Sequence, residues 1–249
     1  MSRPLILLTN DDGISAAGLG ALERAASKLG EVWVVAPSRE QSGVSSALSL
    51  HDPLRIQEAG ERRFAITGTP ADCAYMALQH ILPERPALCI SGVNHGANLG
   101  DDVLYSGTVA AAIEATLSFV PSVAVSLAAW GKGLDYDVAA EVAVDMGKKV
   151  LERGLPRDAL LNLNIPRDAS FDTERVITKL GRRDYERVVT EKHDPRGKPY
   201  YWIGGAQLDF DDLPGSDCNA VAAGKVSITP VHIDLTHYKF LDELRSSWL

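Results

Sequence analysis

The chain has 249 residues, 45% of them apolar and 23% charged, which is the composition of a folded globular protein rather than a disordered, collagenous or coiled-coil one. It carries 25 Lys and Arg against 33 Asp and Glu, so its formal net charge is −8. Binding to nucleic-acid polymers or anionic membranes depends on clustered Lys and Arg, so this charge disfavours both kinds of partner. An anionic substrate would need local positive charge at its site.

Cysteine usage and the start of the chain both predict a cytoplasmic protein. Cys73, Cys89 and Cys218 are widely spaced and form no Cys-x-x-Cys pair, so we expect buried, reduced thiols rather than disulfides or a zinc site. The apolar run that begins at Leu5 is broken by Asp11 and Asp12, too early for a signal sequence. No apolar run approaches the roughly 20 residues of a membrane-spanning helix.

Short apolar runs alternate with helical patterns through the first two thirds of the chain. Strands are predicted at residues 5–8, 32–36, 88–91, 120–127 and 160–165, and helices at 18–29, 69–77, 109–117 and 138–151. Strands separated by helices indicate right-handed βαβ crossovers. We therefore predict an α/β fold with a doubly wound, mostly parallel sheet that has helices on both faces.

This alternation stops near Pro166. Residues 175–215 predict extended strands and a hairpin, a strand is expected at 226–229, closed by Pro230, and an amphipathic helix at 238–244. The hairpin segment has too few aliphatic residues for a core of its own, so it must lie on the preceding part or on another subunit. We therefore expect a catalytic core at residues 1–166 and an extension at 167–249, whose last strand is able to rejoin the core.

Two adjacent carboxylates, Asp11 and Asp12, follow the first predicted strand. A dinucleotide-binding fold would place a Gly-x-Gly-x-x-Gly turn here, and a haloacid-dehalogenase-type phosphatase would need Asp-x-Asp, which Asn10 and Gly13 prevent. Two neighbouring anions repel each other unless a cation lies between them, so the pair is suited to Mg²⁺ or Mn²⁺. The alternative is that one Asp caps the next helix and the other faces solvent.

The loops after the next strands carry further oxygen ligands. Ser42 follows the second strand and Asn94 follows the strand at 88–91. Both loops therefore begin at the carboxyl edge of the sheet. If the strands are neighbours, Asp11, Asp12, Ser42 and Asn94 would hold one hard divalent cation and leave positions for water and a phosphate.

A glycine-rich loop at 91–108 ends at a predicted helix N-terminus. There Ser106, Gly107 and Thr108, with Asn98 nearby, are expected to bind phosphate oxygens through hydroxyl and N–H donors. His95 is either an acid that protonates the leaving oxygen or a residue that packs behind the metal ligands. Asn10 is also expected to lie behind the metal ligands. The pairs Asp101–Asp102 and Asp211–Asp212 are interpreted as caps or solvated loops. For base stacking the candidates are Tyr105 and the aromatics at 200–202, the latter favoured for subunit contacts.

Taken together, these segments resemble the SurE family of survival-protein nucleotidases. The resemblance rests on Leu-Thr-Asn-Asp-Asp-Gly at 8–13, Ser-Gly-Val-Ser at 42–45, Gly-Thr-Pro-Ala-Asp-Cys at 68–73, Ser-Gly-Val-Asn-His-Gly-Ala-Asn-Leu-Gly-Asp-Asp-Val-Leu-Tyr-Ser-Gly-Thr-Val at 91–109, Leu-Asn-Leu-Asn-Ile-Pro at 161–166 and Val-Ser-Ile-Thr-Pro at 226–230. It spans nearly the whole chain and is weakest at 175–215. Gln41 and Lys225 depart from the family pattern outside the metal set.

The resemblance implies a Rossmann-like core, a C-terminal β-hairpin extension that pairs subunits into a homodimer or homotetramer, and one divalent metal ion per subunit. It implies hydrolysis of nucleoside 5′- and 3′-monophosphates, with short polyphosphate open as a further substrate, in the setting of stress survival. The family's metal ligands correspond to Asp11, Asp12, Ser42 and Asn94, and water or the Ser106 hydroxyl would be the nucleophile. The alternative function is a non-catalytic nucleotide-binding module of the stress response.

Overall fold

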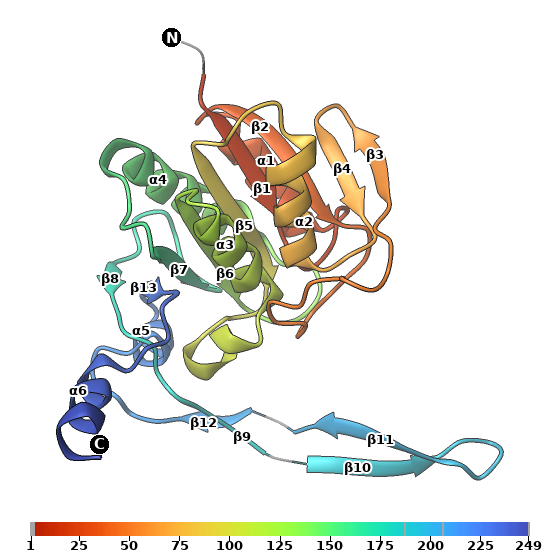
Figure 1. Ribbon diagram of the computed structural model, residues 1–249, viewed down its shortest axis with the longest axis vertical. Coiled ribbons are helices and arrows are strands. Elements are labelled where there is room, and N and C mark those ends of the chain that lie inside the picture. Colours follow the sequence, from red (N-terminus) through yellow and green to blue (C-terminus); the bar gives the residue numbers. More distant parts are fainter. Residues whose placement is uncertain (1–2, 187, 206, 249) are drawn as a thin grey trace.

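The computed structural model describes residues 3–186, 188–205 and 207–248, and its central feature is a nine-stranded sheet (Figure 1). The strands lie in the order β3-β4-β2-β1-β5-β6-β7-β13-β8. Their bounds are β1 Leu5–Thr9, β2 Glu31–Pro37, β3 Ile56–Gly60, β4 Arg63–Ile66, β5 Leu88–His95, β6 Ser122–Ala128, β7 Ala159–Pro166, β8 Arg175–Ile177 and β13 Val226–His232.

The six strands from β4 to β7 are parallel and give the sheet its Rossmann-like topology. Numbered by their order in the chain, they lie as 3-2-1-4-5-6, the arrangement of doubly wound nucleotide-binding folds. The predicted α/β class, the parallel sheet and all five predicted core strands are confirmed. The strand order reverses between β1 and β5, which are parallel neighbours in the sheet but are far apart in the chain.

Helices cover both faces of the sheet because the central strands are apolar on both sides. Ile6 and Leu8 of β1 pack with α1 (Ala17–Ala26) and α4 (Asp137–Arg153), whereas Leu7 packs on the opposite face with α2 (Pro70–Met76) and α3 (Gly107–Leu117). Successive side chains of a strand point to opposite faces, so a strand buried on both sides reads as a continuous apolar run.

Local capping explains where these helices begin. Thr69 and Asp72 form a reciprocal capping box with Pro70 at the first helical position, and the Ser106 hydroxyl accepts from the Val109 N–H at 3.1 Å to start α3. After α2 the chain widens into a π turn, η1 (Ala77–Ile81), and a short 3₁₀ helix, η2 (Gly100–Leu104), precedes α3.

The hairpin of β3 and β4 extends the sheet at one edge and was not predicted. Every residue of β3 is exposed, and the pair meets the sheet only through β4 against β2. An edge strand with water on both faces carries no apolar alternation, so the sequence holds no period-two signal there.

At the other edge, C-terminal residues complete the sheet. Strand β13 lies antiparallel to β7 and parallel to β8, and the helix α5 (Asp217–Ala222) precedes it. The prediction that Pro230 closes the strand is wrong, because β13 continues to His232. Pairing with β8 ends at Ile228, so Pro230 lies where β13 is paired on one side only, a position that tolerates a missing N–H.

The rest of the C-terminal part projects away from the sheet (Figure 1). Strands β9 (Arg183–Tyr185) and β12 (Gln207–Phe210) form one pair and β10 (Val188–His193) and β11 (Pro199–Gly204) form a second, so the predicted hairpin is present. The last helix, α6 (Tyr238–Ser247), has no buried residue. The division into parts at Pro166 stays a prediction, since β8 and β13 belong to the main sheet.

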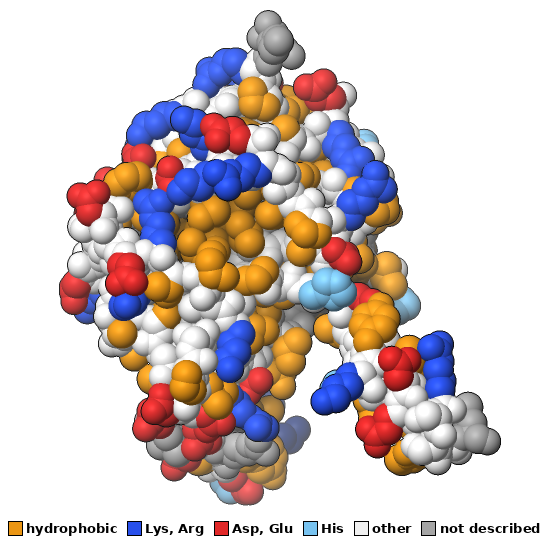
Figure 2. Space-filling model, turned by 90° about the vertical axis from the view of Figure 1, so that its left-hand side faces the viewer, with side chains coloured by type: hydrophobic (Ala, Val, Ile, Leu, Met, Phe, Trp, Pro, Cys, Tyr) orange, Lys and Arg blue, Asp and Glu red, His pale blue; other side chains and the backbone are white. Residues whose placement is uncertain are grey.

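The surface and the thiols agree with the composition. Acidic and basic side chains are interspersed on the face in Figure 2, with apolar side chains between them. Cys73, Cys89 and Cys218 are buried and free, as predicted. Among the helices of the described residues, none combines the length and the apolar character needed to cross a bilayer.

The carboxylate of Asp217, at the start of α5, joins three separate segments. It is fully buried, and its Oδ1 accepts from the N–H groups of Gly181 and Cys218 at 2.7 and 2.8 Å, while its Oδ2 accepts from Gly100 at 2.9 Å. One side chain thereby holds α5, the segment before β9 and the start of η2 in fixed relation.

Asp217→Ala is expected to lower the free energy of unfolding by about 3 kcal/mol, because three buried N–H groups lose their acceptor. Urea unfolding followed by circular dichroism measures the change. Asp211→Ala removes an exposed carboxylate from the preceding loop and serves as the control. Equal stability of the two variants would contradict the assigned role of Asp217.

Candidate active site

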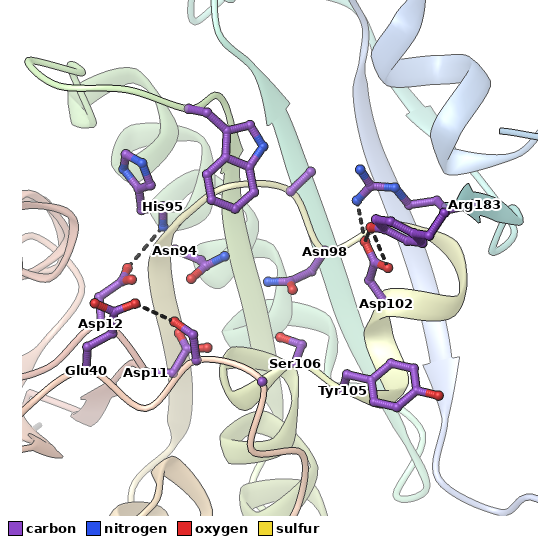
Figure 3. A pocket seen from close by; sticks show the side chains of 15 residues that line it. Asp11, Asp12, Glu40, Asn94, His95, Asn98, Asp102, Tyr105, Ser106 and Arg183 are labelled. Carbon is purple, nitrogen blue, oxygen red and sulfur yellow. Dashed lines mark hydrogen bonds and ion pairs between the residues drawn. The ribbon is translucent and has the colours of Figure 1, made fainter. Parts of the chain in front are cut away.

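The parallel strands bring the loops after β1, β2 and β5 together at one edge of the sheet (Figure 3). Thr9 of β1 is level with Ser91 of β5, so Asp11 and Asn94 both lie just beyond this level. The N–H of Gln41 donates to the carbonyl oxygen of Asp11 at 2.8 Å, which fastens the loop after β2 to the end of β1. Ligands of doubly wound folds bind in the crevice where the strand order reverses, which here lies between β1 and β5.

A cavity of about 450 Å³ opens in this crevice. Of the ten predicted site residues, seven line it: Asp11, Asp12, Ser42, Asn94, His95, Asn98 and Ser106. The structure therefore brings the four predicted metal ligands and two of the four predicted phosphate-binding residues into one cavity.

Asp11 is the most confined of these side chains, with only 4% of its surface exposed. Its carboxylate accepts a hydrogen bond from the hydroxyl of Thr108, at the N-terminus of α3. Burial raises the pKa of Asp11 to about 6; the Thr108 hydrogen bond opposes this rise and the charge of Asp12 adds to it. An anion is thus held where the surrounding protein disfavours its charge.

Asp12 is less buried and has fewer partners. Its Oδ2 accepts from the backbone N–H of His95 at 3.0 Å (Figure 3), and burial raises its pKa while this hydrogen bond lowers it. The His95 ring is held from the other side, since its Nδ1 lies 2.8 Å from the Tyr136 hydroxyl. His95 therefore lies directly behind a predicted metal ligand, and its role as an acid stays a prediction.

Ser42 and Asn94 place oxygen atoms beside the two carboxylates. The Asn94 amide nitrogen donates to the Gly96 carbonyl at 2.8 Å, which leaves its side-chain oxygen available as an acceptor. The Ser42 hydroxyl donates to Glu40 at 2.9 Å, so its oxygen keeps lone pairs for a cation. The carboxylate of Glu40 was not predicted, and it lies near Asp12 at the same side of the cavity (Figure 3).

Ser106 and Asn98 lie farther along the cavity. The Ser106 hydroxyl accepts from Val109, so its own proton is left to donate. The Asn98 amide nitrogen donates to Ser126 at 2.8 Å and keeps a second proton, while the Asn98 backbone is held by the side chains of Asn162 and Asn164. Both predicted phosphate-binding residues can therefore donate toward the cavity.

Three predicted residues lie outside the cavity lining and act on its shape. Thr108 gives its hydroxyl to Asp11 instead of facing a ligand, and a Cβ at Gly107 would come within 2.8 Å of the Asp11 Cβ. Asn10 bonds both the carbonyl and the N–H of Gly13, which closes the turn that presents Asp11 and Asp12. The close approach of α3 to Asp11 thus requires glycine at 107.

The cavity wall opposite Asp11 and Asp12 is formed in part by C-terminal residues. Arg183 of β9 forms an ion pair with Asp102 of η2 (Figure 3). The Tyr185 hydroxyl donates to both oxygens of Asp102 at 2.8 Å. The interpretation of Asp102 as a cap or solvated loop residue is wrong, because it lines the cavity and is bound from β9. Its backbone carbonyl also accepts from the Ser106 N–H at 3.0 Å, which links this wall to the start of α3.

Eight further residues line the cavity: Glu40, Gly43, Ala97, Asp102, Tyr105, Trp130, Arg183 and Tyr185. Tyr105 is the predicted base-stacking candidate, and the other seven were not predicted to belong to the site. Arg183 and Tyr185 belong to the segment with the weakest pattern, and Trp130 follows β6 at the same sheet edge as the predicted loops. Ligands bind beyond the carboxyl ends of parallel strands, and Trp130 lies just beyond the carboxyl end of β6. Trp130 is therefore predictable in the same way as the residues after β1 and β2.

The charges around the cavity suit a divalent cation. Among the described residues that line it there are four carboxylates, those of Asp11, Asp12, Glu40 and Asp102, against one guanidinium, which is paired with Asp102. Within the same part of the chain, no Lys or Arg forms an ion pair with Asp11 or Asp12. Nor do three or more His, Cys, Asp or Glu side chains cluster there as a metal site. The donor set is therefore two carboxylates with hydroxyl and amide oxygens, which fits Mg²⁺ or Mn²⁺ rather than zinc.

Comparison with known proteins agrees with this geometry. Residues 6–187 match the family model described as Survival protein SurE. The chain belongs to the SurE family. Two relatives named 5′-nucleotidase SurE, from Myxococcus xanthus and Geotalea daltonii, are 53% and 50% identical over 245 and 244 residues. These alignments cover 98% and 96% of this chain and 92% and 97% of the relatives.

A solved SurE structure supports the fold assignment. The crystal structure of the SurE protein from Aquifex aeolicus superposes with a TM-score of 0.85 at 40% identity, covering 97% of this chain and 98% of that one. Membership of the SurE family, which the sequence motifs indicated, is thereby confirmed.

Asp11→Asn is expected to raise the free energy of unfolding of the metal-free protein at pH 8 by up to about 3 kcal/mol, since the folded state disfavours the charged form. The pKa of Asp11 is higher in the folded chain than in the unfolded chain. Its ionisation therefore destabilises the fold increasingly as the pH rises from about 4 to about 6, and fully above that. Unfolding in EDTA at pH 8 and pH 4 measures the effect, which should vanish at the lower pH. Asp101→Asn, the same change at an exposed carboxylate, is the control, and a destabilised Asp11→Asn at pH 8 would contradict the assignment.

Proposed function

We propose that this chain is a divalent-metal-dependent phosphomonoesterase that hydrolyses nucleoside 5′- and 3′-monophosphates to a nucleoside and phosphate. One observation carries the proposal: Asp11 and Asp12 lie in one cavity with the N-terminus of α3. Among the described residues, no Lys or Arg forms an ion pair with either carboxylate. The names of the relatives, 5′-nucleotidase SurE, support a nucleotide substrate. Activity at the 3′ position and cytoplasmic residence rest on the sequence alone.

Asp11, Asp12, Ser42 and Asn94 would hold the metal ion, Mg²⁺ or Mn²⁺. When bound, the ion supplies Lewis acidity at a phosphoryl oxygen. The carboxylates that line the cavity would by themselves repel a phosphate, so Asp11 and Asp12 would need to hold a cation before an anionic substrate binds. The buried, otherwise uncompensated carboxylate of Asp11 is the feature that such a cation relieves.

The chain's own residues orient the phosphate and move the proton. Ser106 donates its hydroxyl proton to a phosphoryl oxygen, Asn98 donates through its second amide proton, and the N-terminus of α3 adds its dipole. Asp12 accepts the proton of the attacking water, because it is more exposed than Asp11, whose carboxylate is bound by Thr108. Water is favoured over Ser106 as the nucleophile, since the Ser106 oxygen already caps α3.

Phosphate release from the common nucleoside monophosphates, assayed with Mg²⁺ or Mn²⁺, tests the proposed function. Hydrolysis that EDTA stops and metal restores is the expected result. Metal-dependent nucleotide binding without phosphate release would instead support the non-catalytic module. Short polyphosphate, added to the same assay, tests the further substrate that the family resemblance leaves open.

Asp12→Asn is expected to lower kcat at least about a hundredfold, because it removes both a metal ligand and the proton acceptor while keeping the side-chain shape. Mn²⁺ should raise the Tm of the natural protein and leave that of Asp12→Asn unchanged. Asp101→Asn is the matched control, and we expect it to show wild-type activity and the wild-type increase of Tm with Mn²⁺. Retained activity in Asp12→Asn would contradict both proposed roles of Asp12, as a metal ligand and as the proton acceptor.

We also propose that the chain forms a homodimer or homotetramer through the hairpin of β10 and β11. The hairpin carries large apolar side chains that the described part of the chain leaves uncovered, with Ile203 91% exposed and Val189 and Trp202 largely exposed. Burying such side chains against a second copy is favourable, whereas leaving them in water is not.

Replacing residues 188–204 by a short Gly-Ser turn is expected to reduce the oligomeric state, because the hairpin pairs only with itself. Light scattering after size-exclusion chromatography measures the mass. The variant keeps every strand of the main sheet, so circular dichroism should be close to that of the natural protein. A variant with the natural mass would contradict the assembly role of the hairpin.

A further inference from the structure

Trp130 is an exposed tryptophan inside the active-site cavity. It follows β6, lines the same cavity as Asp12 and Ser106, and has 68% of its surface exposed. The residue before it, Ala129, is buried, so the loop is anchored in the core where the indole begins. An exposed indole in a cavity otherwise dominated by carboxylates and amides calls for a ligand with an apolar face.

The indole is fixed by its neighbours. A Cβ on Gly96 would come within 2.6 Å of the Cη2 and Cζ2 atoms of Trp130, so the ring packs against this backbone only because residue 96 is glycine. The indole also meets the His95 ring edge-to-face, with centroids 5.6 Å apart. A ring held this way is pre-ordered, and a ligand that stacks on it loses little rotamer freedom to the protein.

The same residues connect the indole to the phosphate end of the site. His95, which touches the indole, donates its backbone N–H to Asp12 at 3.0 Å. One residue therefore separates the predicted metal ligand from the aromatic ring. Asp12, Ser106 and Trp130 line one cavity, so a nucleotide whose phosphate binds beside Asp12 and Ser106 has the indole available to its base within the same cavity.

The other two aromatic residues of the cavity are less suited to this role. The Tyr185 ring is covered by the Arg183 guanidinium, 5.2 Å from its centroid, and its hydroxyl is bound to Asp102. Tyr105 lies beyond Ser106 on the side away from Asp11 and Asp12, and its hydroxyl points away from them (Figure 3). Of the three described residues Tyr105, Trp130 and Tyr185 that line the cavity, Trp130 is the one that contacts His95, whose backbone bonds Asp12.

We propose that Trp130 is the platform on which the substrate's base stacks, and that this contact makes purine nucleotides better substrates than pyrimidine nucleotides. The inference rests on the proposed function and specifies its substrate class. A purine presents two fused rings to the indole, whereas a pyrimidine presents one, and the stacking energy grows with the overlapping area. Phosphate monoesters without a base gain nothing from Trp130.

Trp130→Ala is therefore expected to raise KM for AMP and GMP by about 10- to 100-fold, and that for CMP and UMP by less, with kcat nearly unchanged. Ribose 5-phosphate, which has the same sugar and phosphate but no base, should show the same kcat and KM in both proteins. Trp130→Phe should restore most of the affinity for purine nucleotides. Steady-state phosphate release with the five substrates measures these values.

Two further variants are matched controls. Phe119→Ala removes an exposed aromatic ring near the C-terminal end of α3 and should leave every KM unchanged. Tyr105→Ala tests the competing platform. A selective rise of KM for AMP and GMP in Tyr105→Ala, with none in Trp130→Ala, would overturn the proposal, as would an equal rise for ribose 5-phosphate in Trp130→Ala. A changed mass of Trp130→Ala with natural KM values would mean that the indole is a subunit contact, which also overturns it.

Failure of the proposed function would be distinguishable from failure of this inference. If the natural protein releases no phosphate from any of the five esters, the enzymatic proposal fails. Calorimetric titration of AMP and ribose 5-phosphate in the presence of Mg²⁺ then still tests Trp130. Weaker binding of AMP alone in Trp130→Ala would support the platform, and equal binding in the natural protein and the variant would overturn it.

Discussion

The site depends on one buried negative charge, the carboxylate of Asp11 at the end of the central strand β1. It lies under the N-terminus of α3, close enough that residue 107 must be glycine, and its only side-chain hydrogen-bond donor among the described residues is Thr108. A carboxylate kept from water without a cation destabilises the fold. The strain is tolerated because the neighbouring strands and helix fix the position, and it prepares the site for a divalent ion.

The C-terminal part of the chain belongs to the site as much as the parallel core does. Asp217 holds the start of η2, and Arg183 with Tyr185 binds Asp102 within η2, whose carbonyl in turn bonds the N–H of Ser106. The geometry at the start of α3 is therefore set from both ends of the sequence. A division into a catalytic core and an appended extension describes the chain order better than it describes the cavity.

Sequence reasoning located the side chains at and beyond the carboxyl ends of parallel strands, because strand order and the carboxyl-edge rule bring them together. This is why Asp11, Ser42 and Asn94 are predictable. Arg183 and Tyr185 are not, since they come from an irregular strand whose approach to η2 depends on the buried carboxylate of Asp217. The edge strand β3 is exposed throughout and has no periodicity to detect. Thr108 has a different role from the predicted one, because the position of a helix N-terminus does not tell which neighbour its hydroxyl meets.

Strand β13 lies between β7 and β8, although it is made more than fifty residues after β7 along the chain. Asn162 and Asn164 of β7 hold the backbone of Asn98, and β13 is the strand that covers β7 on its other side. During synthesis the cavity therefore remains unfinished until the chain has emerged as far as His232. A nascent chain that already carries all four predicted metal ligands therefore still lacks the strand that pairs with the outer side of β7.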